Sequence, residues 1–193
     1  MKEYITLFKN VLDEESCNLL IEKFENNERL HDNKKNVNET DKWKMQFTQI
    51  NFAENREFEK ENSILKTLFL DAITEYKKEH NIQSYQWPEK FTLEPIRMKR
   101  YMPNSNDMFD EHVDVTNHET ARRFLVLFIY LNDNFEGGET DFTQIKLAVK
   151  PQQGNMILFP PMWNWWHKAN PVIGNNPKYI VGTYMHYLSS DNI

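Results

Sequence analysis

The run FLVLFIYL, residues 124–131, decides how the fold is interpreted. Every residue in it is apolar or aromatic, so both faces of a strand built from it would be buried. The run is far shorter than the ~20 apolar residues that a helix needs to cross a bilayer. We therefore expect a strand inside a sheet, with one of its faces covered by helices.

Short strand-like runs lie on both sides of this segment, from residue 91 onward. Pro, Gly, Asn or Asp separates most of them, and this spacing is typical of a β-sandwich or barrel. The runs are FTLEPIRMKRY (91–101), FDEHVDV (109–115), GETDF (138–142), IKLAVKP (145–151), NMILFP (155–160), HKANPVI (167–173) and KYIVGTYMHYL (178–188).

Two amphipathic helices are predicted before residue 91. Asp13 is a suitable N-cap for the first, and apolar residues recur at helical spacing after it. The apolar stripes are Cys17, Leu20, Ile21 and Phe24 in the first helix, and Leu65, Leu68, Phe69, Ala72, Ile73 and Tyr76 in the second. The polar segment 27–42 between them is predicted to be a long loop, followed by a strand in WKMQFTQINF, residues 43–52.

These patterns predict one mainly β domain over residues 1–193 with flanking helices packed on one sheet. Residues 1–90 would supply helical support and outer strands, and residues 91–193 the catalytic β core. The length suits a single domain with a sizeable core.

Composition narrows the class of partner. The formal net charge is −6, so nothing draws the chain as a whole toward nucleic acid or an anionic membrane. The single cysteine, Cys17, excludes an internal disulfide and a cysteine-based zinc site. The first residues lack the apolar segment of a signal peptide. We expect a soluble, cytoplasmic protein.

The motif HVD places His112 and Asp114 two residues apart in an extended segment, where alternate side chains share a face. With a histidine from another strand, this pair would make the facial triad typical of non-haem Fe(II) oxygenases. The tripeptide alone is weak, because histidine beside aspartate is more often a surface pair. His167 and His186 are the two candidates for the third ligand.

Lys178 opens the last strand-like run, where it shares a face with Ile180, Gly182 and Tyr184. A lysine that points into a β core would be an unpaired buried charge, which is costly. A bound dicarboxylate would satisfy it.

The ordered set HVD, YLNDNFEGGETDF, VKPQQGNMILFP, HKANPV and KYIVGTYMHY resembles the prolyl 4-hydroxylase branch of the Fe(II)/2-oxoglutarate dioxygenases. The resemblance covers roughly residues 97–188 and implies a double-stranded β-helix, the cupin-like jelly roll. It implies that His112, Asp114 and His167 bind iron, which favours His167 over His186. It also implies that Lys178 and Tyr130 bind the distal carboxylate of 2-oxoglutarate and that Tyr101 lines the cofactor pocket.

The sequence departs from the family pattern at two places. The family often has YxxGQxY before the metal pair, whereas this chain has the longer YMPNSNDMF, residues 101–109. The family often has threonine four residues after the basic residue, where this chain has Gly182.

Several further features have weaker assignments. Trp165 and Trp166 are expected at the mouth of the substrate site, because they directly precede the predicted ligand His167 in the sequence. Arg122 is a further candidate for the mouth, since Arg122 and Arg123 either bind substrate or only flank a strand. Gly137 and Gly138 either form a hairpin turn alone or also shape the pocket. The segment 27–42 could close over a peptide, and unchanged kinetics after its shortening would refute this.

The resemblance implies a hydroxylase that converts 2-oxoglutarate and O2 to succinate and CO2. Peptidyl proline is the expected substrate, and ascorbate is expected to support activity. Three alternatives stay open: a dioxygenase acting on a free amino acid or other small molecule, a non-catalytic jelly-roll binding module, and a metal-dependent cupin isomerase. Nucleic acid and membrane are not expected partners.

Overall fold

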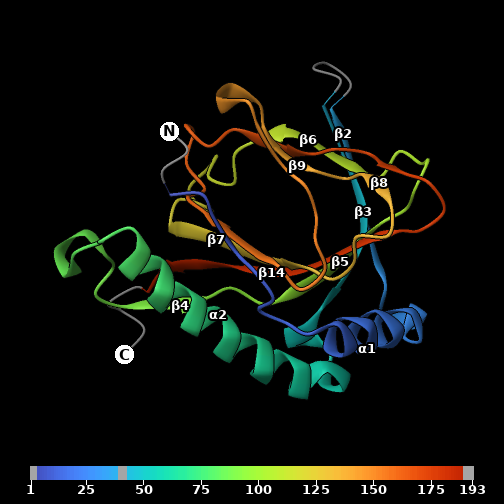
Figure 1. Cartoon of the computed structure of the whole chain (residues 1–193), viewed down its shortest axis with the longest axis horizontal. Helices are drawn as coiled ribbons and strands as arrows, with labels where there is room; N and C mark the ends of the chain where they lie inside the picture. The colour runs from blue at the N-terminus through green and yellow to red at the C-terminus, as the bar shows by residue number, and fades with distance from the viewer. Residues whose placement is uncertain (1–3, 39–42, 189–193) are drawn as a thin grey trace.

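The computed structural model describes residues 4–38 and 43–188. Strand β7 (Arg123–Tyr130) contains most of the apolar run and lies between β11 (Met156–Phe159) and β14 (Lys178–Tyr187) (Figure 1). Leu125, Leu127 and Ile129 face one side of the sheet and join one buried cluster, whereas Val126 and Tyr130 join a second cluster on the other side. The expected strand with two buried faces is therefore confirmed.

Most of the strands form one curled antiparallel sheet, and a separate sheet has only two strands. The order of the curled sheet is β1-β11-β7-β14-β5-β3-β6-β12-β9-β10, with β2 added on β3 and β4 on β14, while β8 pairs with β13. The remaining strands are β1 (Thr6–Phe8), β2 (Asp32–Asn38), β3 (Trp43–Asn51), β4 (Phe91–Leu93), β5 (Arg97–Tyr101), β6 (Met108–His112), β8 (Glu136–Gly137), β9 (Thr140–Phe142), β10 (Leu147–Val149), β12 (His167–Ala169) and β13 (Val172–Ile173).

Two helices, α1 (Glu14–Glu25) and α2 (Glu59–Glu79), lie on the same side of β7, β14 and β5 (Figure 1). Asp13 caps α1 as predicted, because its carboxylate accepts a hydrogen bond from the backbone N–H of Ser16. Short 3-10 turns occur at Glu28–Leu30, Phe52–Glu54, Arg56–Phe58, Ser84–Gln86 and Thr143–Ile145.

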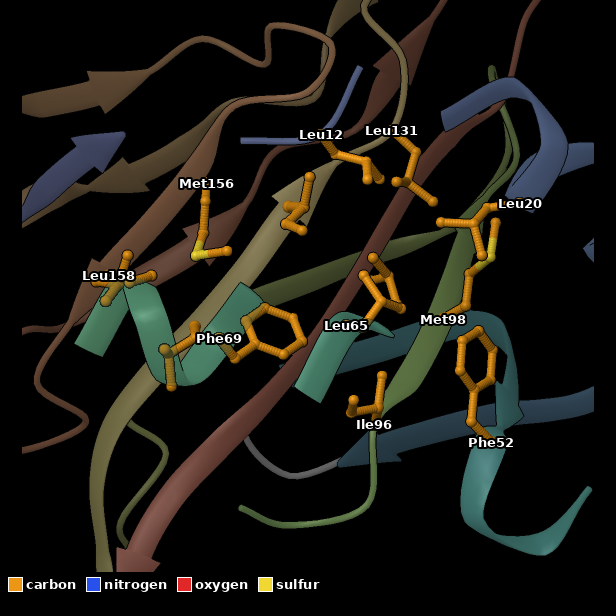
Figure 2. Close-up of a cluster of buried hydrophobic side chains, with 14 of the residues drawn as sticks. Leu12, Leu20, Phe52, Leu65, Phe69, Ile96, Met98, Leu131, Met156 and Leu158 are labelled. Carbon is orange, nitrogen blue, oxygen red and sulfur yellow. The ribbon is translucent and has the colours of Figure 1, made fainter. Parts of the chain in front are cut away.

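The predicted apolar stripes of both helices pack on the sheet. Leu20 of α1 and Leu65 and Phe69 of α2 lie among side chains of the outer sheet face, including Met98 and Leu158 (Figure 2). Burying this apolar area contributes about 25 cal/mol per Å² to the free energy of folding and holds the helices on one face of the sheet. The prediction of a mainly β fold with N-terminal helices packed on one sheet is confirmed.

The predicted loop 27–42 is largely wrong. Residues Asp32–Asn38 form β2, which pairs antiparallel with β3, and residues 39–42 lie outside the described residues. Polar contacts replace the apolar alternation that would have indicated a strand: Thr48 Oγ1 donates to Asn33 over 2.8 Å, and Gln49 Nε2 donates to Asp32 over 3.1 Å. Whether this hairpin closes over a peptide stays a prediction.

Three other boundaries differ from expectation. The run 91–101 is divided at Pro95 into β4 and β5, which both pair with β14. Strand β3 lies between β5 and β6, so residues before 91 form part of the central sheet as well as the outer support. Strand β6 ends at His112, so Asp114 lies just beyond it.

No helix among the described residues is long and apolar enough to cross a membrane.

Candidate metal centre

His112, Asp114 and His167 converge in space. His112 ends β6 and His167 begins β12, and the two residues face each other in the register of this strand pair. One potential ligand atom from each of the three residues lies within 4.8 Å of the others. His112 Nε2 is 3.7 Å from Asp114 Oδ1, and His167 Nε2 is 3.5 Å from Asp114 Oδ2. The structure thus brings together the three residues predicted as ligands.

Backbone carbonyls set the orientation of both imidazoles. His112 Nδ1 lies 2.8 Å from the carbonyl oxygen of Asp110, and His167 Nδ1 lies 2.9 Å from that of Trp165. A carbonyl can only accept, so each Nδ1 must carry the proton. Each Nε2 therefore has a free lone pair directed at the common centre, which is how metal-binding histidines are usually held.

Asp114 provides the test of whether a metal fits. Its Oδ1 accepts a 2.6 Å hydrogen bond from the Tyr184 hydroxyl, whereas its Oδ2 is buried without a hydrogen-bond partner among the described residues. A bare carboxylate oxygen beside two imidazole lone pairs is costly unless a cation is present. The donor set is two nitrogens and one oxygen, the facial set of non-haem iron sites. The residues therefore fit a ferrous ion.

Electrostatics keep the ligand atoms in the forms that bind metals. Burial, with the neighbouring His167, lowers the pKa of His112 to about 3, so its imidazole is neutral. Burial raises the pKa of Asp114, but His167, His112 and the Tyr184 hydrogen bond lower it by more. Asp114 is therefore ionised at neutral pH.

Lys178 lies in the interior, 1% exposed, as predicted. Its ammonium donates a 2.6 Å hydrogen bond to the carbonyl of Gly138 and lies 5.4 Å and 5.6 Å from the ring centres of Tyr101 and Tyr130. Burial lowers the pKa of Lys178 to about 7, although the nearby Glu139 opposes this shift.

A cavity of about 60 Å³ connects Lys178 to the metal centre. It is also lined by Tyr101, Thr140 and the three candidate ligands. The Tyr130 hydroxyl shares a 2.7 Å hydrogen bond with Thr140 Oγ1. The cavity is thus basic at one end and ends at the metal ligands at the other, an arrangement suited to a small dicarboxylate.

The glycine pair of EGGE does more than turn the chain. Gly137 and Gly138 have φ of +69° and +67°, which suits glycine, but β8 pairs with β13 and not with the next strand β9, so the pair is not a hairpin turn. In addition, a Cβ on Gly138 would lie 3.2 Å from Cδ of Lys178, and the Gly138 carbonyl holds the ammonium. Gly138 therefore helps to position Lys178.

A larger cavity of about 620 Å³ also reaches His112 and Asp114, and Trp166 lines it. Trp165 instead packs edge-on against Tyr4, and Arg122 is an exposed residue outside the lining. The structure therefore brings only Trp166 of the three expected mouth residues to this cavity.

The sequence reasoning missed Tyr184 and Lys99, whereas it named Arg123 as a residue that either binds substrate or flanks a strand. Arg123 lines the larger cavity, donates to the carbonyl of Asp114 over 3.0 Å and lies over the ring of Tyr184. Tyr184 was detectable, because it shares a strand face with Lys178. The rival ligand His186 lies on β14 opposite Arg123 and outside both cavities.

Comparisons with known proteins agree with this geometry. The sequence profile of the 2OG-Fe(II) oxygenase superfamily matches residues 96–186. A protein of Acanthamoeba polyphaga mimivirus named "Putative prolyl 4-hydroxylase" is 30% identical over 86 residues, an alignment that covers 40% of this chain and 36% of the relative. The matched stretch thus spans about a third of the length of this curated relative.

Solved structures share the fold over nearly the whole chain. The viral collagen prolyl hydroxylase from Paramecium Bursaria Chlorella virus-1 has a TM-score of 0.66 at 19% identity, with 97% of each chain covered. A prolyl-4-hydroxylase of Pseudomonas putida has a TM-score of 0.62 at 16% identity, covering 97% of this chain and 95% of that one. A Trichoplax adhaerens prolyl hydroxylase bound to a peptide fragment has a TM-score of 0.67 at 14% identity, covering 94% and 83%. The curled sheet is the double-stranded β-helix of these proteins.

Proposed function

Because residues 96–186 belong to the 2OG-Fe(II) oxygenase superfamily, we propose that the protein is an Fe(II)- and 2-oxoglutarate-dependent dioxygenase that hydroxylates peptidyl proline. One observation carries the proposal. The bare, buried Oδ2 of Asp114 lies beside two imidazoles whose Nε2 lone pairs are free, and 2-oxoglutarate enzymes bind iron with this donor set.

The roles of the ligands follow from this geometry. His112, Asp114 and His167 would hold Fe(II) on one face of its coordination sphere and leave positions open for co-substrate and O2. With iron, 2-oxoglutarate and O2 bound, the centre supplies the oxidant for C–H hydroxylation as 2-oxoglutarate becomes succinate and CO2. The carbonyls of Asp110 and Trp165 hold the imidazoles in register throughout.

Lys178 would bind the distal carboxylate of 2-oxoglutarate at the basic end of the small cavity. The co-substrate carboxylate would supply an anionic hydrogen-bond partner, which the buried ammonium does not have among the described residues, where it donates to the neutral Gly138 carbonyl. Tyr101 would line the same end, whereas Tyr130, whose hydroxyl is paired with Thr140, lies near the Lys178 ammonium but outside the cavity lining. Ascorbate would support turnover by keeping the metal ferrous.

The larger cavity would receive the substrate. Its volume of about 620 Å³ is in the range of ligand sites, and it reaches the candidate metal ligands His112 and Asp114. The names of the mimivirus relative and of the similar structures support peptidyl proline as the substrate. The acidic net charge argues against nucleic acid as a partner.

The decisive experiment is mass spectrometry of proline-containing peptides incubated with the protein, Fe(II), 2-oxoglutarate and ascorbate. We expect a gain of one oxygen located on proline, with stoichiometric succinate. Asp114→Ala should abolish both products, and Lys178→Met should raise the KM for 2-oxoglutarate by about 10- to 100-fold, the loss of one charge-assisted contact.

The same experiment separates the alternatives. Succinate without peptide oxidation would overturn the peptidyl substrate and point to a free amino acid or other small molecule. A native protein that neither forms succinate nor binds 2-oxoglutarate would be a binding module, and the enzymatic proposal would be wrong.

A further inference from the structure

The inner face of β5 carries a second lysine toward the candidate metal centre. Arg97, Lys99 and Tyr101 alternate along this face, and in the register with β14 Tyr101 lies opposite Lys178 and Lys99 opposite Ile180. Lys99 lines both the small and the large cavity. It therefore lies where the proposed co-substrate site opens into the proposed substrate site.

The surroundings of Lys99 are aromatic. Its ammonium lies 4.6 Å from the ring centre of Phe47 and 5.9 Å from that of Phe109. Contacts of this kind are favourable, but they offset only part of the cost of drawing an ammonium out of water. In the part of the chain that the structure describes, no carboxylate forms an ion pair with Lys99.

The other cations of the larger cavity already have acidic partners. Arg123 donates two hydrogen bonds to Glu94, over 2.8 Å and 3.1 Å, and Arg97 lies 3.7 Å from the same carboxylate. Lys99 is thus the cation of this cavity that has no carboxylate at ion-pair distance within residues 4–38 and 43–188, and the nearest acid that acts on its charge is Asp114, which the proposed metal would occupy. An incoming anion would complete its environment.

We propose that Lys99 binds a carboxylate of the primary substrate, so that the enzyme selects acids. This inference rests on the proposed function. Two sources could supply the carboxylate, namely the oxidised substrate or 2-oxoglutarate itself. The substrate is favoured because Lys178, deeper in the small cavity, is available for the diacid, whereas Lys99 also faces the larger cavity.

Pairs of substrates that differ only in a carboxylic acid or its amide test whether Lys99 binds a substrate carboxylate. The pairs are a proline peptide with Glu or Gln beside proline, and L-proline or L-prolinamide, each assayed for oxygen gain. The native protein should prefer the acid by about 10- to 100-fold in kcat/KM, the equivalent of one partly buried charge contact. Lys99→Met should remove this preference, Lys99→Arg should largely keep it, and Lys66→Met on the exposed face of α2 should leave it unchanged.

The two carboxylate sources give different results. If the substrate supplies the anion, Lys99→Met should keep the native KM for 2-oxoglutarate and the native rate of uncoupled succinate formation. A raised KM for 2-oxoglutarate with an unchanged acid preference would overturn the inference in favour of the co-substrate. Equal use of acid and amide by the native protein would overturn it outright.

A binding measurement keeps the inference testable if prolyl hydroxylation itself fails. In protein loaded with Mn(II) and 2-oxoglutarate, N-acetyl-L-proline should raise the Tm of the native chain more than its amide does. The difference should vanish in Lys99→Met. Equal shifts for acid and amide would contradict the role of Lys99, whereas absent hydroxylation with a Lys99-dependent shift would contradict only the prolyl substrate.

Discussion

The Tyr184 hydroxyl donates a 2.6 Å hydrogen bond to Oδ1 of Asp114, and this leaves Oδ2 as the carboxylate oxygen without a hydrogen bond among the described residues. The contact connects β14 to a residue that lies beyond the end of β6. It therefore orients the candidate metal ligand from the strand that also carries Lys178.

Replacing Tyr184 by Phe should weaken metal binding by about 10- to 100-fold, the usual effect of removing a group that orients a ligand. Titration with Mn(II), followed by calorimetry, would measure this. The matched control is Tyr179→Phe, because Tyr179 lies on the opposite face of β14 and its hydroxyl donates to Glu25. Equal affinities for native and Tyr184→Phe proteins would contradict the orienting role.

Metal binding should stabilise the fold. At a free Mn(II) concentration of 100 times Kd, the stabilisation should be about 2.7 kcal/mol, which raises Tm by several degrees. Asp114→Ala should remove the rise, whereas Asp141→Ala, which alters a carboxylate paired with Lys168 on neighbouring strands, should retain it. A chelator should return the native protein to its metal-free Tm. A Tm that does not respond to Mn(II) would argue against the site.

Lys178 should make the stability of the metal-free protein depend on pH. Its pKa is about 7 in the folded chain because burial disfavours the ammonium, against about 10.4 in an unfolded chain. Above pH 7 the unfolded state binds more protons, so the free energy of unfolding should rise with pH from 7 toward 10. Denaturant titrations at several pH values would measure the slope.

Lys178→Met should flatten this rise, most clearly between pH 7 and 8. Lys99 contributes at higher pH, because burial lowers its pKa to about 8. A stability that falls with pH over this window in the native protein, but not in the variant, would reverse the sign and contradict the assignment.

Gly182 is required by close packing. A Cβ at this position would lie 2.4 Å from Cβ of Phe128 and 2.5 Å from the carbonyl oxygen of Leu127 on β7. Since backbone must move to relieve such contacts, Gly182→Ala should destabilise the protein by about 1–3 kcal/mol. Chemical denaturation would measure the loss. A variant as stable as the native protein would show that β7 and β14 separate easily.

The sequence allowed the periodic features to be predicted. The two apolar faces of β7, the cap at Asp13 and the helical stripes each arise from local spacing. The strand parity of Lys178 likewise predicted its inward direction, because the period of a strand is two. Family resemblance, rather than spacing, selected His167 over His186.

Other features could not be predicted because long-range contacts decide them. Strand β2 is polar except for Val37, and it is paired by backbone bonds and by Asn33 and Asp32 contacts to β3. The backbone N–H of Asp114 donates to Pro161 over 3.2 Å, which places this residue after its strand has ended. The inward direction of Lys99 was not predicted, because the run 91–101 is divided at Pro95 and the start of β5 could not be located from the sequence.

Strand β14 carries the candidate co-substrate anchor at residue 178 and the metal-orienting tyrosine at residue 184, on one face. A strand rises about 3.3 Å per residue, so β14 alone sets the distance between the co-substrate anchor and the tyrosine that orients the metal ligand. An insertion of one residue between them would turn one anchor out of the interior and disable both functions at once. Protein engineers who wish to change substrate range should therefore leave this strand untouched and vary Trp166, which lines the larger cavity from outside this strand.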